Sequence, residues 1–91
     1  MSDEKRVAIV TGSARGIGKA IAKGLAESGV NVVITDIMEE AANNTANELA
    51  ALGVETLAIK ADVSKAADAE MLIKTTVEKF GKVDYLVNNA G

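Results

Sequence analysis

Apolar and polar positions along the chain follow two alternating patterns. Short runs rich in β-branched residues are typical of buried strands, and four such runs occur, at residues 7–11, 30–36, 54–62 and 83–88. Between these runs, apolar or small residues recur every three or four positions, which is the period of an amphipathic helix. The recurring positions are Ile17, Ile21, Leu25 and Ser28 in the first stretch, Met38, Ala42, Thr45, Leu49 and Leu52 in the second, and Ala69, Ile73, Val77 and Phe80 in the third. The pattern predicts four strands that alternate with three helices.

The residues between these segments indicate how they are connected. Each helical stretch is followed by a glycine and then by a strand, at Gly29, Gly53 and Gly81. Glycine readily adopts the left-handed conformation that ends a helix, and Ser64 is predicted to be the N-cap of the third helix. Strands that alternate with helices form right-handed crossovers and a parallel sheet. We therefore expect an α/β fold.

Every predicted strand ends in a polar residue, at Thr11, Asp36, Asp62 and Asn88. The carboxyl ends of parallel strands meet at one edge of the sheet, and ligands of open α/β sheets bind at that edge. A strand can also end in a polar residue only because it reaches water. Four such endings after a glycine-rich loop favour a binding site.

The glycine-rich loop is the stretch TGSARGIG, residues 11–18. A loop that opens a helix presents backbone N–H groups and the positive end of the helix dipole, both of which suit a pyrophosphate. Gly12 is expected to make the turn, Gly16 to admit the phosphates to the backbone, and Gly18 to let the helix pack closely. Ser13 and Arg15 are candidates for hydroxyl and charge contacts. The spacing differs from the common G-x-G-x-x-G pattern, and a glycine turn needed only for packing remains an alternative.

Asp36 ends the second strand about twenty residues after the loop, where a carboxylate binds the hydroxyls of an adenosine ribose. It would also repel a 2′-phosphate. Two like charges ~4 Å apart repel by on the order of 4 kcal/mol at an effective dielectric constant of about 20, which screening reduces to about 1–2 kcal/mol. Asp36 therefore favours NAD over NADP. Arg15 favours NADP, because it could pair with a 2′-phosphate. Its side chain can turn into water, however, whereas the repulsion between Asp36 and a 2′-phosphate is hard to avoid.

Four motifs together resemble the short-chain dehydrogenase/reductase family, in particular its 3-oxoacyl-carrier-protein reductase branch. They are TGSARGIG, Asp36, ADV at 61–63 and NNAG at 88–91, and the resemblance covers the whole chain. It implies a Rossmann-type parallel sheet of strand order 3-2-1-4. The first two helices would cover one face of this sheet and the third helix the other, and residues 1–91 would form an NAD(P)-binding half-domain that precedes the catalytic half.

The resemblance also implies a role for each matching residue. The pyrophosphate and its ribose would be lined by Gly12, Gly16, Ile17 and Gly18. The adenosine ribose would be held by Asp36, with Ile37 beside the adenine. The adenine amino group would be bound by Asp62, with Val63 behind the ring. Asn88 would brace the sheet, and the cofactor would be bordered by Asn89, Ala90 and Gly91.

The catalytic residues of the family are not matched in this chain. Members carry a catalytic Ser, a Tyr-x-x-x-Lys pair and a helical Asn beyond the NNAG motif. Tyr85 is no substitute, because the residue four positions later is Asn89 rather than lysine. We therefore predict no catalytic residue, and we expect the chain alone to be inactive.

Composition excludes several other classes of protein. The chain is 48% hydrophobic and 25% charged, which is typical of a folded domain. Its net charge of −3, with no basic stripe, argues against nucleic acid as a partner. No His or Cys is present, so no metal site is predicted. No run approaches the ~18 apolar residues that span a bilayer, and the charged start MSDEKR precedes too few apolar residues for a signal peptide. We expect a cytoplasmic protein.

Three functions remain open from the sequence. The first is the cofactor-binding half of an NAD(H)-dependent oxidoreductase that acts on a secondary alcohol or ketone, with a 3-oxoacyl thioester as one candidate. The second is a self-associating module without activity, because the strand at 83–88 would be an exposed edge that pairs with a second copy or with a C-terminal half. The third is an S-adenosylmethionine-dependent methyltransferase, which the loop spacing and NNAG disfavour.

Overall fold

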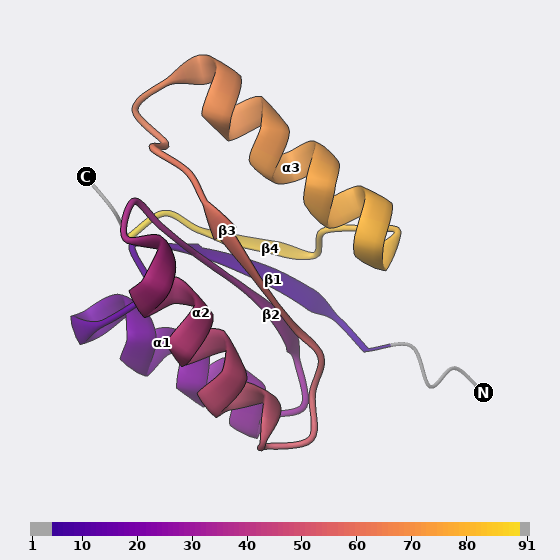
Figure 1. The fold of residues 1–91 in the computed structure, drawn as a ribbon. Helices are drawn as coiled ribbons and strands as arrows, with labels where there is room; N and C mark the ends of the chain where they lie inside the picture. The colour runs from indigo at the N-terminus through magenta and orange to yellow at the C-terminus, as the bar shows by residue number, and fades with distance from the viewer. Residues whose placement is uncertain (1–4, 90–91) are drawn as a thin grey trace.

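The computed structural model describes residues 5–89, which form a four-stranded sheet and three helices (Figure 1). The elements are β1 (Val7–Thr11), α1 (Gly16–Glu27), β2 (Asn31–Asp36), α2 (Glu39–Ala50), β3 (Thr56–Lys60), α3 (Ala66–Phe80) and β4 (Tyr85–Val87). The predicted alternation of strands and helices is confirmed. β3 and β4 are shorter than the apolar runs at 54–62 and 83–88, because both ends of those runs lie in the connecting loops.

The strands are all parallel and lie in the order β3-β2-β1-β4, as predicted. Thr11 at the end of β1 pairs with Thr35 of β2, and Asp36 at the end of β2 pairs with Lys60 of β3. The polar strand ends therefore meet at one edge of the sheet. Among the described residues, β4 lies at the edge of the sheet and pairs with β1 alone.

The helices divide between the two faces of the sheet as predicted (Figure 1). Side chains of a strand point alternately to its two faces. Val10 and Ile34 therefore belong to the cluster packed under α1 and α2, whereas Ile9 and Val33 pack under α3 with Leu72. All five residues of β1 are buried, because both faces of this central strand are covered.

α3 buries a different flank from the one that its apolar spacing indicates. Leu72 and Thr76 are buried against the sheet, whereas Ile73 and Val77 are 38% and 42% exposed. α3 is the one helix on its face among the described residues (Figure 1), so its second apolar flank lies open. Leu86 of the neighbouring β4 is 56% exposed.

The helix ends match the predictions in part. Gly29, Gly53 and Gly81 all have positive φ, as expected after a helix. The prediction that Ser64 caps α3 is wrong, because Lys65 occupies the N-cap position. The hydroxyl of Ser64 instead donates a hydrogen bond of 2.6 Å to Asp62. Within residues 5–89, no helix is long and apolar enough to cross a membrane.

Candidate functional site

A cleft of about 550 Å³ opens at the carboxyl edge of the sheet, on the side covered by α3. Its walls come from the loops after β1, β2 and β3, from α3 and from β4. Five of the residues predicted from the sequence line it, namely Gly12, Asp36, Ile37, Asp62 and Val63. The strand order thus brings these five residues together, although Gly12 and Val63 are 51 positions apart in the sequence.

The three glycines of the loop meet different requirements of backbone conformation and space. Gly12 and Gly16 have φ of 61° and 67°, a conformation that other residues adopt only with strain. A Cβ on Gly18 would collide with the carbonyl oxygen of Gly12 and lie 2.7 Å from Nδ2 of Asn89. Gly18 therefore lets α1 begin directly against the loop and the end of β4. A Cβ on Gly16 would meet nothing within 4 Å, so the backbone there faces open space.

Two residues of the loop, Arg15 and Ile17, have exposed side chains. Arg15 is exposed at the N-cap of α1 and makes no capping hydrogen bond with its side chain. The guanidinium group carries only donors, so it cannot accept from the first amides of α1, although the backbone carbonyl of Arg15 accepts a hydrogen bond of 3.3 Å from the amide of Lys19. A helix N-terminus without a side-chain cap attracts anions. Ile17, in the first turn of α1, is 75% exposed.

The hydroxyl of Ser13 makes two hydrogen bonds within the fold. Its side chain is fully buried, and its hydroxyl donates a hydrogen bond of 2.6 Å to the carbonyl of Val10. The same oxygen accepts a hydrogen bond of 3.1 Å from the amide of Thr35. Ser13 thus joins β1 to β2, and the hydroxyl contact to a phosphate that we expected from it stays a prediction.

Asp36 is held in place from two sides. One carboxylate oxygen accepts a hydrogen bond of 3.2 Å from the amide of Ala14, and the other accepts one of 3.2 Å from the amide of Met38. The side chain remains partly exposed and lines the cleft. Each carboxylate oxygen has a further lone pair, so the group can also accept a hydrogen bond from a ligand hydroxyl. Ile37 beside it is 62% exposed.

Asp62 is held by the residue that was expected to cap α3. Its carboxylate accepts hydrogen bonds from the hydroxyl of Ser64 at 2.6 Å and from the amide of Ser64 at 3.1 Å. These bonds, with a smaller effect from the charge of Lys65, hold the pKa of Asp62 below its ordinary value of 3.8. The group is therefore ionised at neutral pH and can accept a hydrogen bond from a ligand amine.

The first two residues of the NNAG motif tie β4 to the glycine loop. The hydroxyl of Thr11 lies 3.2 Å from the side-chain oxygen of Asn88 and accepts a hydrogen bond of 2.9 Å from the amide of Asn89. Nδ2 of Asn89 donates to the carbonyl of Gly12 at 3.3 Å. Asn88 braces the sheet and also lines the cleft. The predicted site residues Ala90 and Gly91 lie outside the described residues.

Several residues of the cleft were not assigned to the site from the sequence. They are Thr35, Ala61, Ser64, Ala69, Leu72, Ile73 and Leu86. Strand alternation from Ile34 would have placed Thr35 on the α3 face. The apolar residues of α3 and β4 carry no local signal of this kind, because only the packing angle of the helix decides which of them reach the cleft.

The strand order, the glycine loop and the acid at the end of β2 define a nucleotide-binding protein of the Rossmann type. The model of the short chain dehydrogenase family matches residues 6–91. The chain belongs to this family of NAD(P)-binding oxidoreductases, which confirms the resemblance drawn from the motifs.

Curated and solved relatives agree with this assignment. The chain is 47% identical over 87 residues to a 3-oxoacyl-[acyl-carrier-protein] reductase of Synechocystis sp., an alignment that covers 94% of this chain and 35% of the relative. A 7α-hydroxysteroid dehydrogenase solved with NADH and 7-oxo glycochenodeoxycholic acid has a TM-score of 0.91 and 42% identity over 94% of this chain and 34% of its own. A mutant actinorhodin polyketide ketoreductase solved with NADPH has a TM-score of 0.91 and 40% identity over 99% of this chain and 34% of its own. The chain thus spans about a third of each relative.

Proposed function

We propose that this chain is the NAD(H)-binding half of a short-chain oxidoreductase. The observation that carries the proposal is the carboxylate of Asp36, which the amides of Ala14 and Met38 hold at the cleft. A carboxylate fixed at this point suits the ribose hydroxyls of NAD(H) and repels the 2′-phosphate of NADP(H). The positive charge of Arg15 would instead favour the 2′-phosphate of NADP(H). Its side chain is exposed, however, and makes no hydrogen bond to the N-terminus of α1.

The other residues of the site fit the remaining parts of the dinucleotide. The pyrophosphate is assigned to the glycine loop and the N-terminus of α1, where Gly16 leaves the backbone open. The adenosine is assigned to Asp36 and Ile37 on one side and to Asp62 and Val63 on the other. Asn89, with Ala90 and Gly91 beyond it, is assigned to the border of the site. In the whole enzyme, these residues would hold a cofactor that supplies hydride-transfer chemistry.

The proposed substrate is a secondary alcohol or ketone. A 3-oxoacyl thioester is one candidate, because the Synechocystis relative is named a 3-oxoacyl-[acyl-carrier-protein] reductase. No residue of this chain is proposed to be catalytic. The hydroxyl of Tyr85 accepts a hydrogen bond of 2.7 Å from Arg6, a residue that precedes β1, so it lies at the opposite edge of the sheet from the cleft. We propose that the chain alone transfers no hydride.

A pair of titrations tests the proposal. The chain contains no Trp, so the fluorescence of NADH and of NADPH reports their binding without protein interference. We expect the chain to bind NADH more tightly than NADPH, and we expect Asp36→Asn to reduce this preference by about tenfold. Glu40→Gln, which removes the same charge from the first turn of α2, is the control and should keep the preference. A wild-type preference for NADPH, or no binding of either, would contradict the proposal.

A second candidate function, self-association without activity, is supported by the open side of the sheet. β4 is an edge strand, and Leu86 on it and Ile73 and Val77 on α3 are exposed apolar residues. An apolar edge strand invites pairing with another chain, and we propose a second copy as the partner. Sedimentation at high concentration tests this. A dimer that Leu86→Lys dissociates and Leu52→Lys does not would support it, because Leu52 is 43% exposed but lies after α2. A monomer would contradict it.

A further inference from the structure

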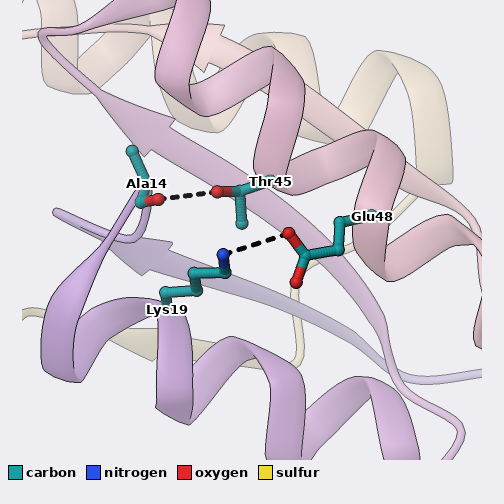
Figure 2. Close-up of polar contacts among 4 residues, drawn as sticks. All are labelled: Ala14, Lys19, Thr45 and Glu48. Carbon is teal, nitrogen blue, oxygen red and sulfur yellow. Dashed lines mark hydrogen bonds and ion pairs between the residues drawn. The ribbon is translucent and has the colours of Figure 1, made fainter.

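Ala14 lies at the centre of a chain of hydrogen bonds that joins α2 to the candidate site. Its amide donates to the carboxylate of Asp36 at 3.2 Å. Its carbonyl accepts a hydrogen bond of 2.6 Å from the hydroxyl of Thr45 on α2 (Figure 2). Ala14 and Thr45 are 4% and 3% exposed, so water has little access to this contact.

We infer that Thr45 is a positioning residue that sets the discrimination between NADH and NADPH. The inference rests on the proposed function, in which Asp36 makes that discrimination. Only two backbone bonds separate the amide of Ala14 from its carbonyl, so a shift of the carbonyl also moves the amide that holds Asp36. Thr45 prevents this shift because a buried carbonyl that loses its partner must move to find another.

The residue before Ala14 is fixed by another element. The amide of Ser13 donates to the carbonyl of Thr35 at 3.1 Å, and its hydroxyl bridges β1 and β2. Thr45 therefore anchors the side of Ala14 that leads to the open Gly16. Without its hydroxyl, the loop would be fixed at Ser13 and free to turn beyond it. The carboxylate of Asp36 would then keep the amide of Met38 and lose that of Ala14.

A second contact of α2, made with α1 instead of the loop, provides a matched control. Lys19 of α1 and Glu48 of α2 form an ion pair of 3.0 Å, with side chains that are 34% and 57% exposed (Figure 2). Exposed pairs of this kind contribute little to stability. This pair joins α1 to α2 as Thr45 joins α2 to the loop, but it does not contact Ala14 or Asp36. Removing this ion pair tests whether a weaker contact between α1 and α2 is enough to alter the discrimination between NADH and NADPH.

The experiment compares Thr45→Val, Thr45→Ser and Glu48→Gln with the wild-type chain. In the ligand-free protein, we expect Thr45→Val to accelerate hydrogen exchange at the Ala14 amide relative to the core amide of Ile9. In titrations, we expect it to weaken NADH binding by about fivefold or more and to lower the preference over NADPH by a similar factor. Thr45→Ser retains the hydroxyl, and Glu48→Gln leaves it untouched, so both should keep the preference within about twofold.

Three results would overturn the inference, and they can be told apart. An equal loss of affinity for NADH and NADPH in Thr45→Val would show a purely structural role. Unchanged exchange at the Ala14 amide would show that Thr45 does not hold it. If the wild-type chain itself had no preference for NADH, the proposed function would fail, and the role of Thr45 in discrimination would fail with it.

Discussion

Asp84 and Val7 are joined by two hydrogen bonds that tie the approach to β4 to the start of β1. The amide of Asp84 donates to the carbonyl of Val7 at 2.8 Å, and the amide of Val7 donates to the carboxylate of Asp84 at 2.8 Å. Nζ of Lys82 lies 3.3 Å from the same carboxylate oxygen. The bond from Val7 is the main cause, and Lys82 a lesser one, of a pKa of Asp84 that lies below its ordinary value of 3.8. An edge strand of three residues thus gains a further attachment to the sheet.

The lowered pKa of Asp84 predicts a dependence of stability on pH. A carboxyl group with a lower pKa in the folded chain stabilises the fold above its unfolded pKa, and this contribution is lost as the pH falls through the folded value. We expect Asp84→Asn to lower the melting temperature at neutral pH, and we expect the difference from wild type to shrink as the pH falls below 3.8. Glu78→Gln, an exposed change of the same kind on α3, is the control. A difference that did not vary with pH would contradict the role of ionised Asp84.

Substitution of Gly18 tests the close contact between α1 and the loop. We expect Gly18→Ala to destabilise the chain by about 1–3 kcal/mol, because the added Cβ collides with the backbone of Gly12. Gly24→Ala in the same helix is the matched control, since a Cβ there meets nothing within 4 Å. It should stabilise the chain by about 0.5–1 kcal/mol, as alanine does inside a helix. Urea unfolding of both variants measures the two changes in the free energy of unfolding. Equal changes would rule out a specific role for Gly18.

Thr35 carries a buried hydroxyl that finds no hydrogen-bond partner among the described residues. A buried polar group without a partner lowers stability. We expect Thr35→Val to raise the free energy of unfolding of the ligand-free chain by about 1 kcal/mol. In contrast, Thr76→Val should lower it by about 0.5–1.5 kcal/mol, because the buried hydroxyl of Thr76 donates to the carbonyl of Leu72 at 2.8 Å. Thermal unfolding without nucleotide measures the stability of both variants. A loss of stability in Thr35→Val would contradict the prediction.

The hydroxyl of Ser64 is expected to lower the pKa of Asp62 at the cleft. Its bond to Asp62 is the largest cause of the lowered pKa of that carboxyl group. Ser64→Ala should therefore raise the pKa of Asp62 toward 3.8, while the bond from the backbone amide of residue 64 keeps part of the shift. Ser64→Thr retains a hydroxyl and should leave the pKa low. A carbon-detected NMR titration of the Asp62 carboxyl group measures both, and an unchanged pKa in Ser64→Ala would refute this account.

The sequence predicted those parts of the site that depend on local backbone geometry or on strand ends. Asp36 and Asp62 follow directly from the ends of strands in a parallel sheet. The bonds of small hydroxyl side chains were harder to predict, and the N-cap predicted for Ser64 was wrong. Ser13 bonds within the sheet, and Ser64 bonds to Asp62 rather than to the helix. A serine hydroxyl has acceptors in several directions, and its choice depends on neighbours that the fold brings to it.

The order of strands and helices along the chain, the family, and the edge of the sheet where the cleft lies could all be predicted from the sequence. These features could be predicted because side-chain alternation and helical period are local, and because each glycine of the loop is required by the backbone conformation at its own position. In contrast, the folded structure was needed to show that Thr45 holds Ala14, 31 positions away, and that Ala14 holds Asp36, 22 positions away. Bonds of this kind have no characteristic spacing in the sequence. They form because the packing of α2 on the sheet brings the two groups close together in space.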